Sequence, residues 1–144
     1  MSSLWQKDPH AVPDILVVED EPTEIYLLRE AFTTGHRAVH VHSVPSVDHA
    51  LAFLRHDAPY SHAPHPQLII TSIKLPGKSG FDLLVEVKRD PALRPIPVIV
   101  LSLYDEPAVI QKSYALGANG YVIKPQDLEA FFTAIRTLVE EWLT

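Results

Sequence analysis

The stretch ILVVEDEP, residues 15–22, contains the pattern that decides the fold. Its four consecutive apolar residues are too few for a helix and are apolar on both faces, which is typical of a strand covered on both sides in a parallel sheet. Three acidic residues and a proline follow at once, and proline in a first turn marks a helix start. The stretch therefore predicts a buried strand that leads directly into a helix.

The same alternation of strand and helix recurs along the chain. Further strands are expected at 38–44, where the pattern suits an edge strand, and at 68–70, 98–101 and 120–123. Helix starts are expected at Pro22, at Pro45 after Ser43, and at Pro107 after Asp105. The strongest helical periodicity lies over 128–142. Five strands interleaved with five helices predict an open α/β sandwich.

Composition restricts the class of protein. The chain has 144 residues, of which 47% are hydrophobic, enough for one domain around one core. A formal charge of −6 argues against nucleic acid or an anionic membrane as partner. The absence of cysteine excludes disulfides and thiolate metal sites. Residues 1–13 lack an apolar signal core, and no apolar run approaches the roughly 20 residues that cross a bilayer, so we expect a cytoplasmic protein.

Polar residues stand where the predicted strands end. Ligands of open α/β sheets bind at the carboxyl ends of the strands, so these residues are the candidates for chemistry. The first strand is followed by Glu19 and Asp20, and the third, fourth and fifth end at Ser72, Ser102 and Lys124. Two carboxylates, two hydroxyls and one ammonium should therefore converge on one edge of the sheet.

This set, in its order and spacing, resembles the receiver domain of two-component response regulators. The resemblance rests on ILVVEDEP, PVIVLS and GANGYVIKP and covers nearly the whole chain. A narrower similarity, in LPGKSGFDLLVEVKRDPALRPIPVIVLS and the C-terminal EEWL, is to small stand-alone receivers that serve bacterial phytochromes. The resemblance implies a flavodoxin-like parallel sheet of order 2-1-3-4-5 with helices on both faces. It also implies an N-terminal extension over 1–13 and a receiver domain over 14–144, with no output domain.

The resemblance implies a role for each residue at this edge. Glu19 and Asp20 would help to hold a divalent cation, and the backbone carbonyl of Lys74 would be the remaining protein ligand. Hard cations bind oxygen ligands of this kind. Lys124 would pair with the phosphoryl group and Ser102 would donate its hydroxyl to it, since positive charge and donors stabilise developing negative charge.

Tyr121 would be the aromatic switch of the family, although its ring could equally be a half-buried residue of an edge strand.

Ser72 departs from the family pattern, because it stands four residues before Pro76, where receivers keep the phosphoacceptor aspartate. A serine hydroxyl is a poor nucleophile without an adjacent base, and no histidine belongs to this set. The loss of one carboxylate also weakens cation binding, so we expect no required cofactor and only weak Mg²⁺ affinity. Phosphotransfer should be absent or impaired, and we expect no enzyme activity. Ser72 could be a silent relic, an alternative phosphosite or a substitution that locks one conformation.

The expected partners are a sensor histidine kinase, for which the narrower similarity implies a phytochrome, or another receiver. We also predict a homodimer built from the last helix and its neighbours, with Phe131, Phe132 and Trp142 in the interface, because large aromatics often anchor interfaces.

Two other functions stay open. The degenerate cleft could instead accept an anion or small ligand, aided by Lys74 and Lys78. A P-loop nucleotide-binding enzyme fits less well, because Ser72 replaces the first glycine of that motif and Pro76 removes a backbone donor.

The histidines form a second feature, since all eight lie in the first 65 residues. His40 and His42 should project to the same side of their strand, while His62 and His65 lie in a proline-rich loop. Two imidazoles at this spacing could begin a zinc site, could face solvent, or could make a contact pH-sensitive.

Overall fold

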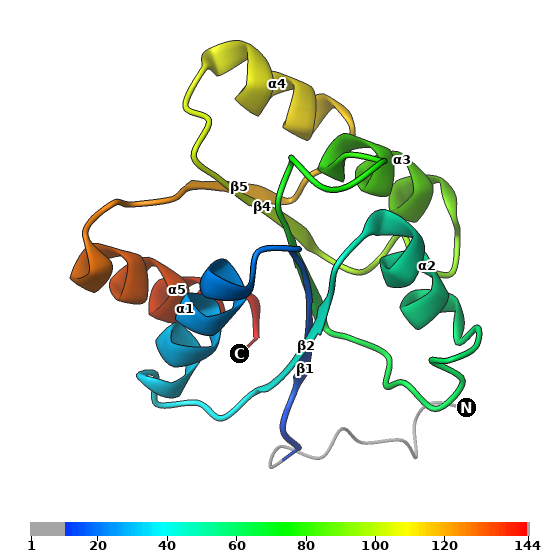
Figure 1. Cartoon of the computed structure of the whole chain (residues 1–144), viewed down its shortest axis with the longest axis horizontal. Helices are drawn as coiled ribbons and strands as arrows, with labels where there is room; N and C mark the ends of the chain where they lie inside the picture. The colour runs from blue at the N-terminus through cyan, green and yellow to red at the C-terminus, as the bar shows by residue number, and fades with distance from the viewer. Residues whose placement is uncertain (1–10, 144) are drawn as a thin grey trace, which may run out of the picture.

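The computed structural model describes residues 11–143, so most of the predicted extension over 1–13 lies outside the described residues. It contains a parallel sheet of order β2-β1-β3-β4-β5, which confirms the predicted flavodoxin-like architecture (Figure 1). The strands are β1 (Asp14–Val18), β2 (His40–Val44), β3 (Leu68–Thr71), β4 (Val98–Ser102) and β5 (Gly120–Ile123). The helices are α1 (Pro22–Thr33), α2 (Val47–Arg55), α3 (Gly80–Arg89), α4 (Pro107–Ala115) and α5 (Leu128–Trp142).

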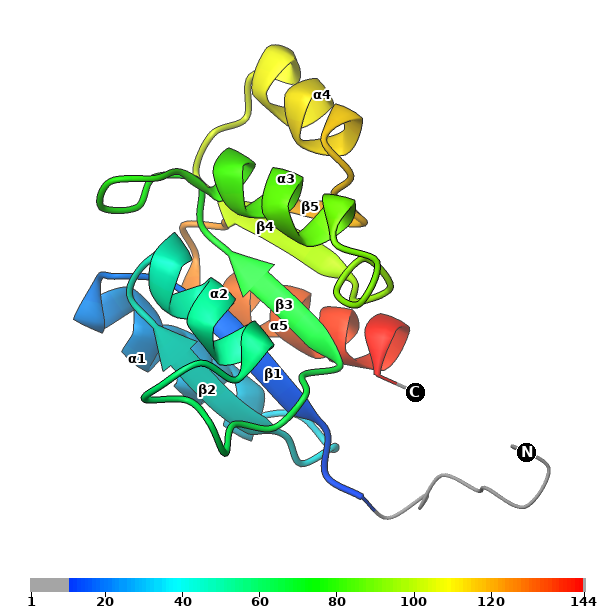
Figure 2. The same ribbon diagram turned by 90° about the vertical axis from the view of Figure 1, so that its right-hand side faces the viewer.

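Helices cover both faces of the sheet, and the sheet divides the core into two layers (Figures 1 and 2). Ile15 and Val17 of β1 pack with the buried residues of α1 and α5, whereas Leu16 and Val18 pack with those of α2 and α3. Successive side chains of a strand point to opposite faces, which is why a central strand must be apolar throughout. The continuous apolar runs in the sequence are thus explained by burial on two sides.

Two of the three predicted helix starts are confirmed. α1 begins at Pro22 and α4 at Pro107, where a proline needs no hydrogen-bond partner for its nitrogen. The prediction at Pro45 was wrong by two residues, since α2 begins at Val47. The reason is Ser46, whose side chain accepts a hydrogen bond from the backbone N–H of His49 at 3.2 Å and caps the helix.

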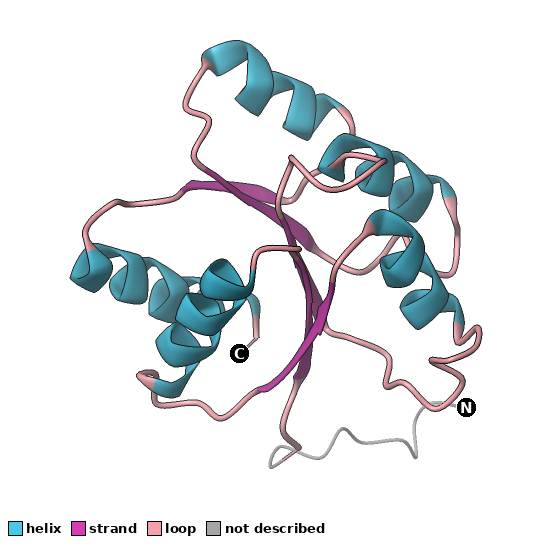
Figure 3. Cartoon of the chain, viewed as in Figure 1, coloured by secondary structure: helices cyan, strands magenta, loops and turns pink. Residues whose placement is uncertain are grey.

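The last helix is amphipathic, as its spacing predicts, and packs beside α1 (Figure 3). Its buried residues are Phe131, Ile135, Leu138 and Val139. Within the described part of the chain, no helix combines the length and the apolar character needed to cross a membrane.

Candidate functional site

Three of the predicted site residues each add one further hydrogen bond to the parallel ladder at its carboxyl edge. The backbone N–H of Glu19 donates to the last carbonyl of β2 at 3.0 Å, and that of Ser72 to the last carbonyl of β1 at 3.1 Å. The backbone N–H of Lys124 likewise donates to the last carbonyl of β4 at 2.7 Å. Because parallel strands end at one edge, these bonds place the side chains of distant segments around a common site.

Ser72 uses its hydroxyl to bind Glu19. The hydroxyl donates to Oε1 of the Glu19 carboxylate, whose other oxygen accepts the backbone N–H groups of Asp20 and Glu21, each at 3.0 Å. Glu19 is only 6% exposed, so these three donors replace the water that a buried carboxylate would otherwise need. Ser72 therefore supplies part of the solvation of Glu19.

The loop after Ser72 folds tightly over it. The backbone N–H of Gly80 donates to the carbonyl of Ile73 at 2.8 Å. A Cβ atom at Gly80 would lie 2.2 Å from the carbonyl oxygen of Ser72, so only glycine fits there. Gly77 has φ +76°, the left-handed conformation that glycine adopts without strain. The two glycines explain the spacing of the L-P-x-x-x-G pattern in backbone terms.

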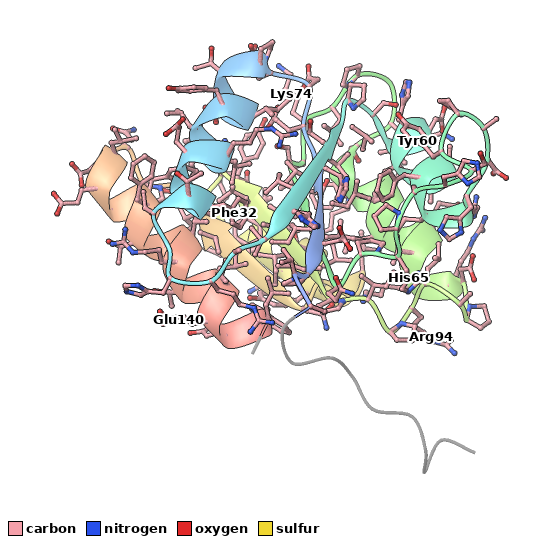
Figure 4. All side chains as sticks on the ribbon, turned by 90° about the horizontal axis from the view of Figure 1, so that it is seen from below. Phe32, Tyr60, His65, Lys74, Arg94 and Glu140 are labelled. Atoms are coloured by element: carbon pink, nitrogen blue, oxygen red, sulfur yellow. The ribbon has the colours of Figure 1, made fainter. Side chains whose placement is uncertain are left out.

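The two lysines of this loop lie at the surface. Lys74 is exposed at the end of the molecule where α1 begins, opposite His65 and Arg94 (Figure 4). Lys78 donates to the carboxylate of Asp48 at 2.8 Å, and both side chains are more than half exposed. This hydrogen bond and the attraction between the charges raise the pKa of Lys78 and lower the pKa of Asp48. Lys78 is thus paired with α2 and not with Ser72.

Lys124 has a partner that sequence reasoning missed. Its ammonium donates to Oε1 of Glu24, in the first turn of α1. The two side chains are 15% and 29% exposed, which makes this the least exposed ion pair among those between described residues. Within the described residues, no hydrogen bond links Lys124 to Ser72. The only sequence signal for Glu24 was its acidic character near a helix start, which is common for other reasons.

Ser102 and Tyr121 both bind the loop that follows β4. The hydroxyl oxygen of Ser102, which is 6% exposed, accepts the backbone N–H of Tyr104 at 3.0 Å. The hydroxyl of Tyr121 donates to the carbonyl oxygen of Tyr104 at 2.7 Å, while its ring packs against the core layer of α2 and α3. One residue of the β4–α4 loop is therefore held through both of its backbone polar groups.

The residues present do not fit the divalent cation that the resemblance implies. Both oxygens of Glu19 already accept donors from the chain, and the side chain of Asp20 is exposed. The described residues contain no group of three or more carboxylate or imidazole side chains that could hold a metal ion. Hard cations are held by several oxygen ligands, so one free carboxylate and the carbonyl of Lys74 form a weak set.

The predicted interface residues differ in exposure. Phe131 is 5% exposed and belongs to the core layer of α1 and α5, while Phe132 and Trp142 are half-buried and pack against that layer. A side chain as buried as Phe131 has little surface left for a partner. An interface on this helix would have to use its more exposed neighbours.

His40 and His42 lie on the same side of β2, as their spacing indicates, and share one partner. Nδ1 of His40 and Nε2 of His42 lie 3.4 Å and 2.9 Å from Oδ1 of Asp14. The described residues provide no further ligand that would complete a zinc site with them. Their contacts join the edge strand β2 to its neighbour β1.

Known proteins with this arrangement identify the family. Residues 15–136 match the response regulator receiver domain. This chain belongs to the response regulator receiver family. The response regulator Rcp1 of Synechocystis sp. is 31% identical over 139 residues, which cover 90% of this chain and 88% of Rcp1. The two-component response regulator ORR13 of Oryza sativa subsp. japonica is 35% identical over 115 residues, which cover 78% of this chain and 87% of ORR13.

Solved structures of receivers have the same fold. The phosphorylated cyanobacterial phytochrome response regulator RcpA has a TM-score of 0.87 at 36% identity, over 93% of this chain and 96% of that one. The Mn²⁺-bound form of Rcp1 has a TM-score of 0.83 at 31% identity, over 91% and 94%. The bacteriophytochrome response regulator RtBRR has a TM-score of 0.75 at 32% identity, over 89% and 78%. The family and the fold predicted from the sequence are both confirmed.

Proposed function

We propose that this receiver acts in two-component signalling through protein contacts, with phosphotransfer absent or impaired because Ser72 occupies the phosphoacceptor position. Its partners are a sensor histidine kinase or another receiver. RcpA and RtBRR are described as phytochrome and bacteriophytochrome response regulators, which supports a phytochrome-linked pathway for this chain.

The observation that carries the proposal is that a serine, which has no carboxylate, follows β3 at the carboxyl edge of the sheet, where its hydroxyl donates to Glu19. A receiver accepts a phosphoryl group on a carboxylate oxygen, and position 72 provides only a hydroxyl. That hydroxyl is engaged with a carboxylate whose remaining contacts are backbone donors of its own turn. A phosphate ester on serine would also lack the lability of an acyl phosphate, so it could not reproduce a reversible signal.

The test is phosphoryl uptake. The unmodified protein, Ser72→Ala and Ser72→Asp are incubated with magnesium and acetyl phosphate or a phosphorylated histidine kinase, and intact mass is recorded. We expect a phosphoryl group only on Ser72→Asp. An alkali-labile phosphoryl group on the unmodified protein would contradict the proposal, because it would place an acyl phosphate on another carboxylate. An alkali-stable adduct that Ser72→Ala lacks would identify Ser72 as an alternative phosphosite, which would also contradict it.

We further infer that the chain forms a homodimer through α5 and its neighbours β5 and α4. Three large apolar side chains on these elements are about half exposed, Tyr114 (48%), Ile123 (47%) and Leu128 (51%). Beside them, Trp142 and Tyr114 line a hollow of about 460 Å³. β5 is also an edge strand with one unpaired side, a feature that proteins usually cover.

Light scattering at tens of micromolar tests the dimer. We expect Leu128→Ser and Ile123→Ser to shift the protein towards the monomer. Val85→Ser is the matched control, since Val85 is 40% exposed on α3, which covers the other face of the sheet. A monomeric unmodified protein would remove the inference.

A further inference from the structure

The ion pair between Lys124 and Glu24 links the end of β5 to the first turn of α1. Lys124 is 15% exposed at its side chain, and an ammonium so far removed from water needs a counter-ion. In a receiver with an acceptor aspartate, the residue at position 72 could provide that charge. Ser72 is neutral, so another carboxylate must do so.

Glu24 is the carboxylate available to Lys124. Both oxygens of Glu19 already accept hydrogen bonds, from Ser72 and from two backbone N–H groups, and the side chain of Asp20 is exposed. Glu24 is itself favoured where it stands, because a negative charge in the first turn of a helix interacts well with the partial positive charge of the helix N-terminus. The ion pair is therefore favoured both by the partial burial of Lys124 and by the position of Glu24 at the helix N-terminus.

We propose that Glu24 is the counter-ion that Lys124 takes in place of the missing acceptor carboxylate, and that this ion pair holds the ammonium away from position 72. Glu24 is thus a positioning residue of the pocket, and it acts through Lys124. The inference rests on the proposed loss of phosphotransfer at Ser72 and extends it. Two features would then impair phosphotransfer in this pocket: the serine at position 72 and the engagement of Lys124 by Glu24.

The consequence is a gain of activity that can be measured. When Ser72→Asp is incubated with magnesium and acetyl phosphate, the introduced carboxylate oxygen attacks phosphorus, the bond from phosphorus to the acetate oxygen breaks, and acetate leaves with the electron pair. Lys124 would stabilise the charge on the transferring group, but in this variant Glu24 competes for it. Removal of the negative charge at position 24 frees the ammonium.

We expect Ser72→Asp/Glu24→Gln to take up the phosphoryl group about tenfold faster than Ser72→Asp, the change that one charge-assisted hydrogen bond of modest strength corresponds to. Ser72→Asp/Glu21→Gln is the matched control. Glu21 is an exposed acid of the same turn, and its substitution removes the same charge without touching Lys124. It should react at the rate of Ser72→Asp. Adding Lys124→Met to the Ser72→Asp/Glu24→Gln variant should abolish the gain.

A merely structural role for Glu24 predicts a loss or no change, so only a gain supports the inference. The inference is overturned if Ser72→Asp/Glu24→Gln is no faster than Ser72→Asp, including the case in which neither is modified, or if the Glu21→Gln control gains as much. These outcomes differ from a failure of the proposed function, which would appear as an alkali-labile phosphoryl group, or as a phosphoryl group on Ser72 itself, in the unmodified protein.

A second measurement needs no acceptor carboxylate. In the unmodified chain, Glu24→Gln, Lys124→Met and the double variant are compared by the midpoint of urea unfolding. A shared ion pair predicts that the double variant is shifted by less than the sum of the two single shifts. Additive shifts would overturn the pairing, whatever the variants of Ser72 do.

Discussion

Lys88 of α3 lies beside the amino-terminal ends of β4 and β5, and Lys124 directly follows the carboxyl end of β5. Both are partly withdrawn from solvent, yet their partners differ in kind. Lys88, at the end of α3, donates to the carbonyl oxygens of Arg94 at 3.1 Å and Ile96 at 2.9 Å, and to Oδ1 of Asn119 at 3.0 Å. All three acceptors are neutral. Lys124 donates instead to a carboxylate.

We interpret this difference as one of role. The hydrogen bonds of Lys88 are part of the fold, whereas the ion pair of Lys124 at the carboxyl edge is one that a change of partner can replace. The amide oxygen of Asn119 also accepts the backbone N–H of Val98 at 2.9 Å, so Lys88 belongs to a network that joins α3, β4 and the residue directly before β5. Gly117, with φ +108°, leaves room for it, since a Cβ there would lie 2.6 Å from Cγ of Lys88. The acceptors of Lys88 are fixed parts of the fold, whereas we propose that Lys124 can exchange Glu24 for a carboxylate at position 72. The two lysines therefore differ in their partners and not in residue type, which is the basis for proposing a structural role for Lys88 and a functional one for Lys124.

The largest effect on stability should come from Lys88→Met, which keeps most of the apolar stem and removes the donors. We expect the free energy of unfolding to fall by about 2–4 kcal/mol, because backbone carbonyls lose their partners in a partly buried site. Urea unfolding followed by circular dichroism measures the change. Lys78→Met is the control, since the exposed pair of Lys78 with Asp48 should leave stability unchanged. If Lys88→Met and Lys78→Met change the free energy of unfolding by the same amount, the hydrogen bonds of Lys88 do not stabilise the fold as proposed.

A smaller effect is expected from Lys124→Met. The variant removes the ion pair, but Glu24 is 29% exposed and can be rehydrated at a helix N-terminus, so the free energy of unfolding should fall by about 1 kcal/mol. The same unfolding experiment makes the comparison. A loss in the free energy of unfolding as large as that of Lys88→Met would mean that both lysines stabilise the fold to the same extent. The contrast between them would then disappear.

The smallest effect is a pH dependence. Burial lowers the pKa of Lys88 from its ordinary value of 10.5. Between the lowered pKa and 10.5 the unfolded chain binds more protons than the folded one, so this residue makes stability rise with pH in that window. The difference in unfolding free energy between the unmodified protein and Lys88→Met should therefore widen as pH rises towards 10.5. A difference that stays constant or narrows would contradict the lowered pKa of Lys88.

The sequence by itself determined the architecture and the positions of the site residues. Short runs that are apolar on both faces are typical of strands covered on both sides, and parallel strands end at one edge, so Glu19, Ser72 and Lys124 were expected to lie near one another. The departure at Ser72 could also be read from the sequence, because the resemblance to receivers places the acceptor aspartate four residues before Pro76. The start of α2 was misjudged because a serine cap outweighed a proline signal.

Only the tertiary structure decided which side chains pair. Ser72 and Glu19 are 53 residues apart and Lys124 and Glu24 are 100 apart, so no local pattern connects them. Each partner depends on how deeply a side chain is buried and on which neighbouring donor or acceptor is already taken. Burial and competition of this kind belong to the packed molecule as a whole, whereas strand ends and helix starts are local properties of the chain.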